Sequence, residues 1–153
     1  MKRFTRISMA LLMCVILTAL AGCSKISRIK NSISGDKFTE IAENYGLEVE
    51  KKDNSSVTTY IAQGNDIYAE FYVFDKNSYV TTSYQYITGN IESAFENISA
   101  EPETRDGEYP RFQMKADSLN AVASVIGNTM VYVYSTSASG IDNVDEFMEK
   151  VGY

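Results

Sequence analysis

Hydrophobic and polar positions alternate with two different periods along the chain, and these periods separate expected helices from expected strands. A spacing of three to four between apolar residues is typical of an amphipathic helix, and a spacing of two is typical of a half-buried strand. The helical spacing occurs at 36–46, 77–98 and 142–151. The strand spacing occurs at 47–52, 57–63, 66–74, 111–116, 119–126 and 129–136. The sequence therefore predicts three helices and six strands after residue 34.

Two glycine-asparagine pairs divide the later strands into hairpins. Gly64-Asn65 and Gly127-Asn128 each stand between two apolar runs, and this dipeptide tolerates the positive φ angles of a tight primed turn. Superposing the pairs, 63 residues apart (127 − 64), places Ile67 on Met130. We interpret the segment as two copies of a βββα unit preceded by one helix, although the pairs can also be two unrelated common turns. The expected class is α+β, an antiparallel β-sheet with helices packed mainly on one face.

The first 23 residues have the organisation of an export signal. Positively charged residues at the start precede an apolar run, 7–20, that contains no charge. A membrane-spanning helix needs about 20 such residues, so this shorter run is typical of the hydrophobic region of a signal peptide. It is followed at once by Leu20-Ala21-Gly22-Cys23, which resembles the lipobox of bacterial lipoproteins.

The lipobox resemblance implies a location and an anchor. In that family a diacylglyceryl group is attached to the cysteine sulfur, here Cys23, and the chain is cleaved before it. An ordinary cleaved signal is the alternative. The expected organisation is a signal peptide at 1–22, a lipidated cysteine and basic linker at 23–34, and a single α+β domain at 35–153. The protein is then expected on the extracytoplasmic face of the cell membrane, held there by its lipid.

Charge excludes one class of partner. The chain without residues 1–22 has 11 basic and 20 acidic residues, a net charge of −9, and the acidic residues lie mostly in the domain. Such a domain repels phosphate groups, so we expect no nucleic acid partner. The linker carries Lys25, Arg28 and Lys30, which either lie along an anionic membrane surface or form a solvated spacer.

The residue types present exclude most catalytic sites. The chain has no histidine, and its only cysteines are Cys14, in the signal, and Cys23. Ser-His-Asp, Cys-His and zinc sites therefore cannot be built, and no glycine-rich phosphate loop occurs. We expect no cofactor and no metal site, since the acidic loop 101–108 lacks the calcium-loop spacing and contains Arg105. Acid pairs in 101–108 or 142–149 leave a carboxylate-based cell-wall glycosidase as a remote alternative.

Tyrosine is the remaining feature that indicates a binding surface. The chain has eleven tyrosines and no tryptophan, and tyrosine suits surfaces where an apolar ring must carry a polar tip. Transferring side-chain directions from the first hairpin to the second predicts one sheet face that is apolar and not covered by the later helices. The residues of this candidate binding surface are Tyr68, Tyr72, Val122, Val131 and Val133. If the first helix, with Phe38, covers this face, its residues are core instead.

Three hypotheses for the function follow. The favoured one is a membrane-anchored extracytoplasmic lipoprotein that acts as a non-catalytic binding or accessory module for a protein, peptide or glycan. The second is a homodimeric structural or interaction protein that uses the same face. The third is the carboxylate-based glycosidase.

Overall fold

The computed structural model describes residues 30–153. The signal peptide, the lipobox with Cys23 and the linker up to residue 29 lie outside the described residues. Three helices and seven strands alternate along the described part of the chain. In chain order they are α2 (Gly35–Asn44), β1 (Glu48–Asp53), β2 (Val57–Gly64), β3 (Ile67–Phe74), α3 (Asn77–Ala94), β4 (Glu103–Arg105), β5 (Arg111–Ala116), β6 (Leu119–Ile126), β7 (Thr129–Ser135) and α4 (Ile141–Val151).

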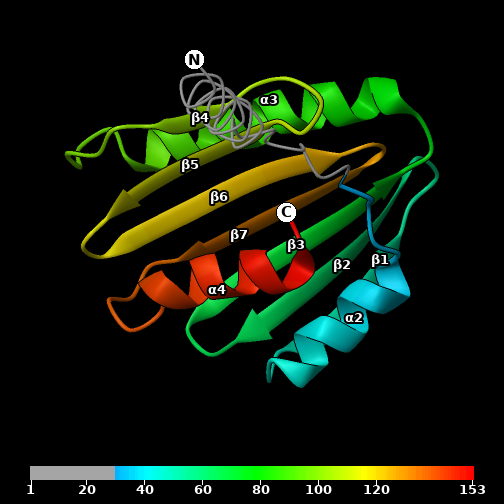
Figure 1. The fold of residues 1–153 in the computed structure, drawn as a ribbon, viewed down its shortest axis with the longest axis horizontal. Helices are drawn as coiled ribbons and strands as arrows, with labels where there is room; N and C mark the ends of the chain where they lie inside the picture. Colours follow the sequence, from blue (N-terminus) through cyan, green and yellow to red (C-terminus); the bar gives the residue numbers. More distant parts are fainter. Residues whose placement is uncertain (1–29) are drawn as a thin grey trace, which may run out of the picture.

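The strands form one antiparallel sheet, as the sequence predicts. Their order across the sheet is β1-β2-β3-β7-β6-β5-β4, so the two halves of the chain meet where β3 pairs with β7 (Figure 1). The α+β class is therefore confirmed, and the order of elements contains two βββα runs. The short edge strand β4, within the segment expected to be an acidic loop, was not predicted.

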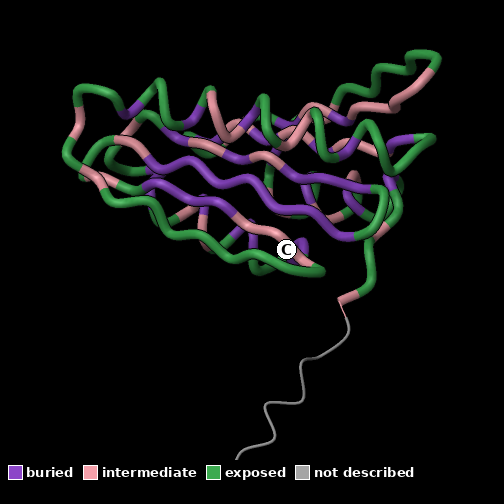
Figure 2. The backbone as a smooth tube through the Cα atoms, turned by 90° about the horizontal axis from the view of Figure 1, so that it is seen from above, coloured by how far each residue is buried: buried purple, intermediate pink, exposed green. Residues whose placement is uncertain are grey.

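Helices cover the two faces of the sheet unequally. Helices α2 and α4 lie on one face, which we call the two-helix face, and they stand in front of the sheet in Figure 1. Helix α3 packs on the opposite face, mainly on β6. Buried positions are concentrated in the strands, and exposed ones on the outer sides of the helices (Figure 2). Two of the three described helices thus share a face, in line with the expected packing, and the third covers a second core on the other side of the sheet.

Local sequence explains where α2 and α4 begin and end. The Ser34 side chain accepts a hydrogen bond from the Lys37 backbone N–H, so Ser34 is the N-cap of α2, two residues before the start of the predicted helical spacing at residue 36. Gly152 follows α4 in the left-handed conformation, with Lys150 in the last turn. These capping residues fix both helices on the two-helix face.

The turn of the first hairpin lies one residue later than predicted. Gly64 pairs with Ile67, so the two turn residues are Asn65 and Asp66, both with positive φ. In the second hairpin the turn residues are Gly127-Asn128, as expected, because Ile126 pairs with Thr129. The equivalent positions are therefore 62 residues apart (127 − 65), and the predicted superposition was wrong by one residue.

This one-residue error reverses every side chain of the second hairpin, because neighbouring residues of a strand point to opposite faces. Val122, Val131 and Val133 lie on the two-helix face, where none of them exposes any surface. Tyr68 and Tyr72 lie on the other face. The predicted surface of five residues is therefore wrong as a unit, and its three valines are core residues beneath α2 and α4.

Tertiary contacts explain why the first turn uses asparagine and aspartate. Asn65 Nδ2 donates to the Tyr45 carbonyl at the end of α2, over 2.5 Å. The Ser139 hydroxyl donates to Asp66 Oδ2 over 2.6 Å, just before α4. The two polar side chains therefore join the turn to both helices, which offsets the strain of their left-handed backbone. A pattern read along the strand alone contains no sign of these contacts.

Candidate functional site

Tyrosine rings dominate the part of the sheet that α3 leaves uncovered. Tyr68, Glu70 and Tyr72 alternate along β3 and point to the α3 side of the sheet. On the neighbouring strand β7, Tyr134 pairs with Tyr68, and Tyr132 pairs with Glu70. We call this surface, made of Tyr68, Glu70, Tyr72, Tyr132 and Tyr134, the tyrosine face. All five side chains are half-buried.

Glu70 is the polar centre of the tyrosine face. Its Oε1 accepts a hydrogen bond from the Tyr68 hydroxyl over 2.7 Å, and its Oε2 accepts one from the Tyr72 hydroxyl. Burial, followed by the hydrogen bond to Glu70, raises the pKa of both phenols above the ordinary value. Both tyrosines therefore remain protonated donors at neutral pH, and they hold the carboxyl group in place from either side.

The rings also contact one another across the two strands. The ring centroids of Tyr68 and Tyr134 are 5.2 Å apart, and those of Tyr132 and Tyr134 are 5.5 Å apart and stacked. Burial raises the pKa of Tyr132 to about 12. Neighbouring rings at these separations stabilise each other and restrict their rotamers. The tyrosine face is thus a preformed aromatic surface.

Helix α3 forms one wall of a groove on this face. Its buried stripe consists of Val80, Ile87, Ile91 and Phe95, which pack on the sheet. This rotation of the helix leaves the Tyr86 side chain 71% exposed. The groove has a volume of about 410 Å³ and is lined by Glu70, Tyr72, Thr82, Ser83, Tyr86, Ile87, Asn90 and Tyr132. We call it the tyrosine groove, and its size is that of a small-ligand site.

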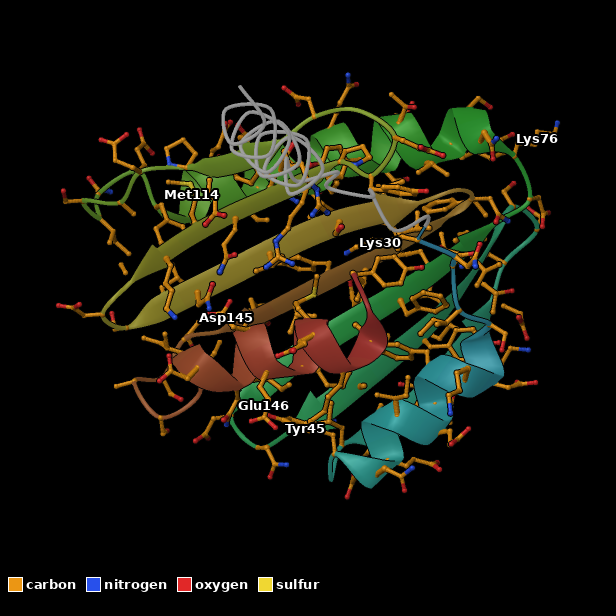
Figure 3. The ribbon with its side chains drawn as sticks, in the orientation of Figure 1. Lys30, Tyr45, Lys76, Met114, Asp145 and Glu146 are labelled. Atoms are coloured by element: carbon orange, nitrogen blue, oxygen red, sulfur yellow. The ribbon has the colours of Figure 1, made fainter. Side chains whose placement is uncertain are left out.

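A second cluster of polar residues lies on the two-helix face, between β5 and α4. Asp145 Oδ1 accepts from Gln113 Nε2 over 2.8 Å, and its Oδ2 accepts from Lys115 Nζ over 2.8 Å. Asn120, fully buried, donates to the Ile141 carbonyl over 2.9 Å. Figure 3 shows Asp145 on the side of α4 that faces these strands. The cluster joins the start of α4 to β5 and β6.

Electrostatics agree with a structural role for this cluster. Burial alone would raise the pKa of Asp145, but hydrogen bonds from Lys115, Gln113 and Asn120 outweigh it and hold this pKa below the ordinary value. In the described part of the chain, no buried side-chain nitrogen or oxygen lacks a hydrogen-bond partner. A cluster whose groups satisfy one another has little capacity left for a ligand.

Another hollow lies at the seam between α2 and α4. The Tyr45 hydroxyl lies 3.4 Å from Glu146 Oε2, and Lys150 Nζ lies 5.7 Å from the centre of the Tyr45 ring. Figure 3 shows Tyr45 and Glu146 facing each other across the two helices. These contacts are all between the two helices, so the seam is explained by helix packing.

Three of the acidic residues considered for catalysis share a hollow: Glu101, Glu103 and Asp145 line one of about 370 Å³ together with Arg111, Gln113 and Lys115. Glu101, Glu103, Asp106 and Glu108 are all exposed, and Glu103 belongs to the edge strand β4. Asp142 and Asp145 both lie within reach of Lys115, which forms ion pairs with them over 3.2 and 2.8 Å. The carboxylate of Asp145 accepts hydrogen bonds from Lys115 and Gln113, and Glu101 and Glu103 are exposed, so this hollow does not hold a buried pair of acids.

Sequence reasoning found part of the tyrosine groove. It placed Tyr68 and Tyr72 together, and the period of two along β3 also placed Glu70 beside them. It missed Tyr132 because the predicted turn was wrong by one residue, and it missed Tyr86 because the rotation of the 77–98 helix on the sheet depends on tertiary packing. The tertiary contacts of Asn65 and Asp66 set that register, and they cannot be read from spacing.

The proposed anchor lies outside the part of the chain that the structure describes. Cys23 and the lipobox therefore remain predictions from the sequence. Among residues 30–153, no helix is long and apolar enough to cross a membrane.

Comparisons with known proteins yield one distant structural likeness. No protein-family model matches the chain. No curated protein matches it either. The fold is similar to that of a GTP binding regulator from Thermotoga maritima, with 15% sequence identity over 78% of this chain and 84% of that chain and a TM-score of 0.44. A likeness at this level says nothing about what the chain binds.

Proposed function

We propose that this chain is an extracytoplasmic lipoprotein that acts as a non-catalytic binding module, with the tyrosine groove as its ligand site. The observation that carries the binding role is the open aromatic surface on a sheet whose other face is closed by two helices. Aromatic side chains with polar tips are enriched where proteins bind partners, because they bury a large area at a small entropic cost. The four groove residues Glu70, Tyr72, Tyr86 and Tyr132 combine this property with one charged group.

The anchoring part of the proposal comes from the lipobox. Attachment of two or more acyl chains to Cys23 would hold the domain at the membrane without a spanning helix. The first helix of the domain begins at Gly35, so 11 residues, 24–34, separate Cys23 from it. A ligand of the tyrosine groove would then be bound close to the membrane surface.

The experiment that tests the binding role uses the full chain in detergent with isotope-labelled tyrosine. Four probes are titrated: blocked pentapeptides with a central arginine or a central glutamate, a neutral trisaccharide, and choline. Light scattering of the same sample reports self-association. The proposal expects at least one probe, or a second copy, to shift the ring signals of Tyr72, Tyr86 and Tyr132. If all four probes leave these signals unchanged and the chain stays monomeric, the binding role is contradicted.

A matched pair of variants shows whether a shift reports the groove. Tyr86→Ala removes an exposed ring at the groove wall, whereas Tyr79→Ala removes an exposed ring of the same helix that does not line the groove. The proposal expects only the first to weaken binding. Equal weakening by both variants would contradict the assignment of the site.

A further inference from the structure

The tyrosine groove has one charged group and no group of opposite sign. Glu70 lies between Tyr68 and Tyr72 along β3 and opposite Tyr132 on β7. Among the described residues that line the groove, none is lysine or arginine. The described residues as a whole have nine basic and twenty acidic side chains, a net charge of −11. The net negative charge of the domain therefore attracts a cation from a distance, and Glu70 attracts it within the groove.

The two hydrogen bonds that Glu70 accepts leave room on its carboxylate for further donors. A carboxylate has about four lone-pair sites on its two oxygens. The Tyr68 hydroxyl occupies one on Oε1, and the Tyr72 hydroxyl occupies one on Oε2. Each oxygen thus keeps capacity for one further donor. A guanidinium presents two parallel N–H groups, which match the two oxygens of a carboxylate.

The rings around Glu70 favour the same kind of group. A planar cation is attracted to the faces of aromatic rings, and arginine uses this contact more often than lysine. Tyr72 and Tyr132 lie on the sheet side of the groove, and Tyr86 lies on the helix side. Burial raises the pKa of the Tyr72 and Tyr132 phenols, so both stay neutral and offer their ring faces to a cation.

We propose that the tyrosine groove binds an arginine side chain of a partner polypeptide, with its guanidinium on the free side of Glu70 and among the rings of Tyr72, Tyr86 and Tyr132. This inference rests on the proposed binding function and names the ligand of the same site. A neutral glycan, an acidic peptide or a second copy of the chain would use the rings without needing the Glu70 charge.

The test compares two peptides of nearly identical shape on the full chain in detergent. One is a blocked pentapeptide with a central arginine, and the other carries citrulline, which is neutral, at the same position. Binding is followed through the ring signals of isotope-labelled tyrosine. We expect the citrulline peptide to bind at least about tenfold more weakly, since its neutral urea group forms neither an ion pair with Glu70 nor a cation–π contact with the rings.

Two substitutions, each of which removes one negative charge, distinguish binding in the groove from the general electrostatic attraction of the acidic domain. Glu70→Gln is expected to weaken the arginine peptide at least about tenfold. Glu48→Gln removes the same charge from an exposed position of β1 that does not line the groove, and we expect less than about a twofold change there. Tyr86→Leu is a second groove variant at an exposed site, which keeps the test valid if Glu70→Gln does not fold; we expect it to weaken binding about threefold.

Each outcome decides the inference. Arginine preference over citrulline, lost in Glu70→Gln and kept in Glu48→Gln, supports it. Equal binding of both peptides, or full binding by a folded Glu70→Gln variant, overturns it. If only the trisaccharide, the glutamate peptide or a second copy occupies the groove, the binding function stands and the arginine inference fails. If nothing occupies it, both fail.

Discussion

The two faces of the sheet both carry large side chains but differ in how far helices cover them. On the two-helix face, Phe71 and Val131 are enclosed by α2 and α4 and have no exposed surface. On the opposite face, α3 covers mainly β6, and Tyr68 and Tyr132 stay half-buried at its side. The comparison shows that coverage by helices, more than the pattern of the strands, decides which apolar face is core and which can bind.

The largest contrast between the faces should come from an introduced charge. Val131→Asp places a carboxyl group without a partner in the closed core, and we expect it to remove at least about 4 kcal/mol from the free energy of unfolding. Tyr86→Asp changes an exposed position of α3 and should alter that free energy by no more than about 0.5 kcal/mol. Urea denaturation of both variants measures the difference. A stable, folded Val131→Asp variant would show that the two-helix face is not closed.

The next largest difference between the faces should come from removing an aromatic ring from either side of β3. Phe71 stacks on Phe38 with centroids 4.9 Å apart, so Phe71→Ala leaves a cavity and should cost about 3 to 5 kcal/mol. Tyr68→Ala, three residues away on the other face, loses one cross-strand ring contact and one partly buried hydrogen bond, and should cost about 1 kcal/mol. Thermal or urea unfolding compares them. Equal costs would mean that the tyrosine face is as closed as the other.

These expectations depend on features that the sequence predicts to different degrees. Periodicity located the helices and six of the strands, because burial on one face imposes a spacing on each element. It failed for β4, whose three residues are all exposed and carry no alternation. It also failed for the turn between β2 and β3, and so for the superposition of the two hairpins, because the turn at Asn65 and Asp66 is selected by contacts with Tyr45 and Ser139, far away in the sequence.

The candidate site was predicted only as far as one strand. Tyr68, Glu70 and Tyr72 follow from the period of two along β3, but Tyr132 needs the correct register and Tyr86 needs the rotation of α3. The rotation is set by Val80 and Ile91, which bury the side of the helix away from Tyr86. Half of the groove therefore depends on tertiary packing that a single sequence does not encode locally.

The turns that set the register allow a smaller test. Gly127 has φ +60° and open space around it, so Gly127→Val strains the backbone without a clash and should cost about 1 to 2 kcal/mol. Gly89 lies within α3, also in open space, and Gly89→Ala should instead stabilise by about 0.5 to 1 kcal/mol. Chemical denaturation of the two variants checks both signs. A neutral Gly127→Val would contradict the hairpin turn.

At alkaline pH the folded protein should lose a modest amount of stability that comes from one buried tyrosine on each face of the sheet. Burial raises the pKa of Tyr132 on the tyrosine face, and of Tyr153 on the two-helix face, from 10.0 to about 12. The folded protein therefore keeps protons that the unfolded chain releases, so this stability is full below pH 10 and is lost as the pH rises from 10 to 12. We expect Tyr132→Phe to shift alkaline unfolding to higher pH, measured by circular dichroism. An unchanged or lower midpoint would contradict the burial of this phenol.

The anchor can be tested apart from either face. Cys23→Ser removes the sulfur that the thioether requires, so we expect the variant to lose lipid labelling and to remain uncleaved by the lipoprotein pathway. Incorporation of labelled palmitate in cells measures this, with Cys14→Ser as the matched control that keeps the lipobox. Equal incorporation by the Cys23→Ser variant and the unaltered chain would contradict lipidation.

The most direct test of the central claim maps ligand binding onto the two faces at once, because tyrosines report from both. Titrating the arginine pentapeptide into the full chain with isotope-labelled tyrosine should shift the ring signals of Tyr72, Tyr86 and Tyr132. The signals of Tyr45, Tyr60 and Tyr153, which belong to the two-helix face, should stay in place. Shifts at these three rings, with none in the groove, would show that the ligand binds on the two-helix face, which would contradict the central claim.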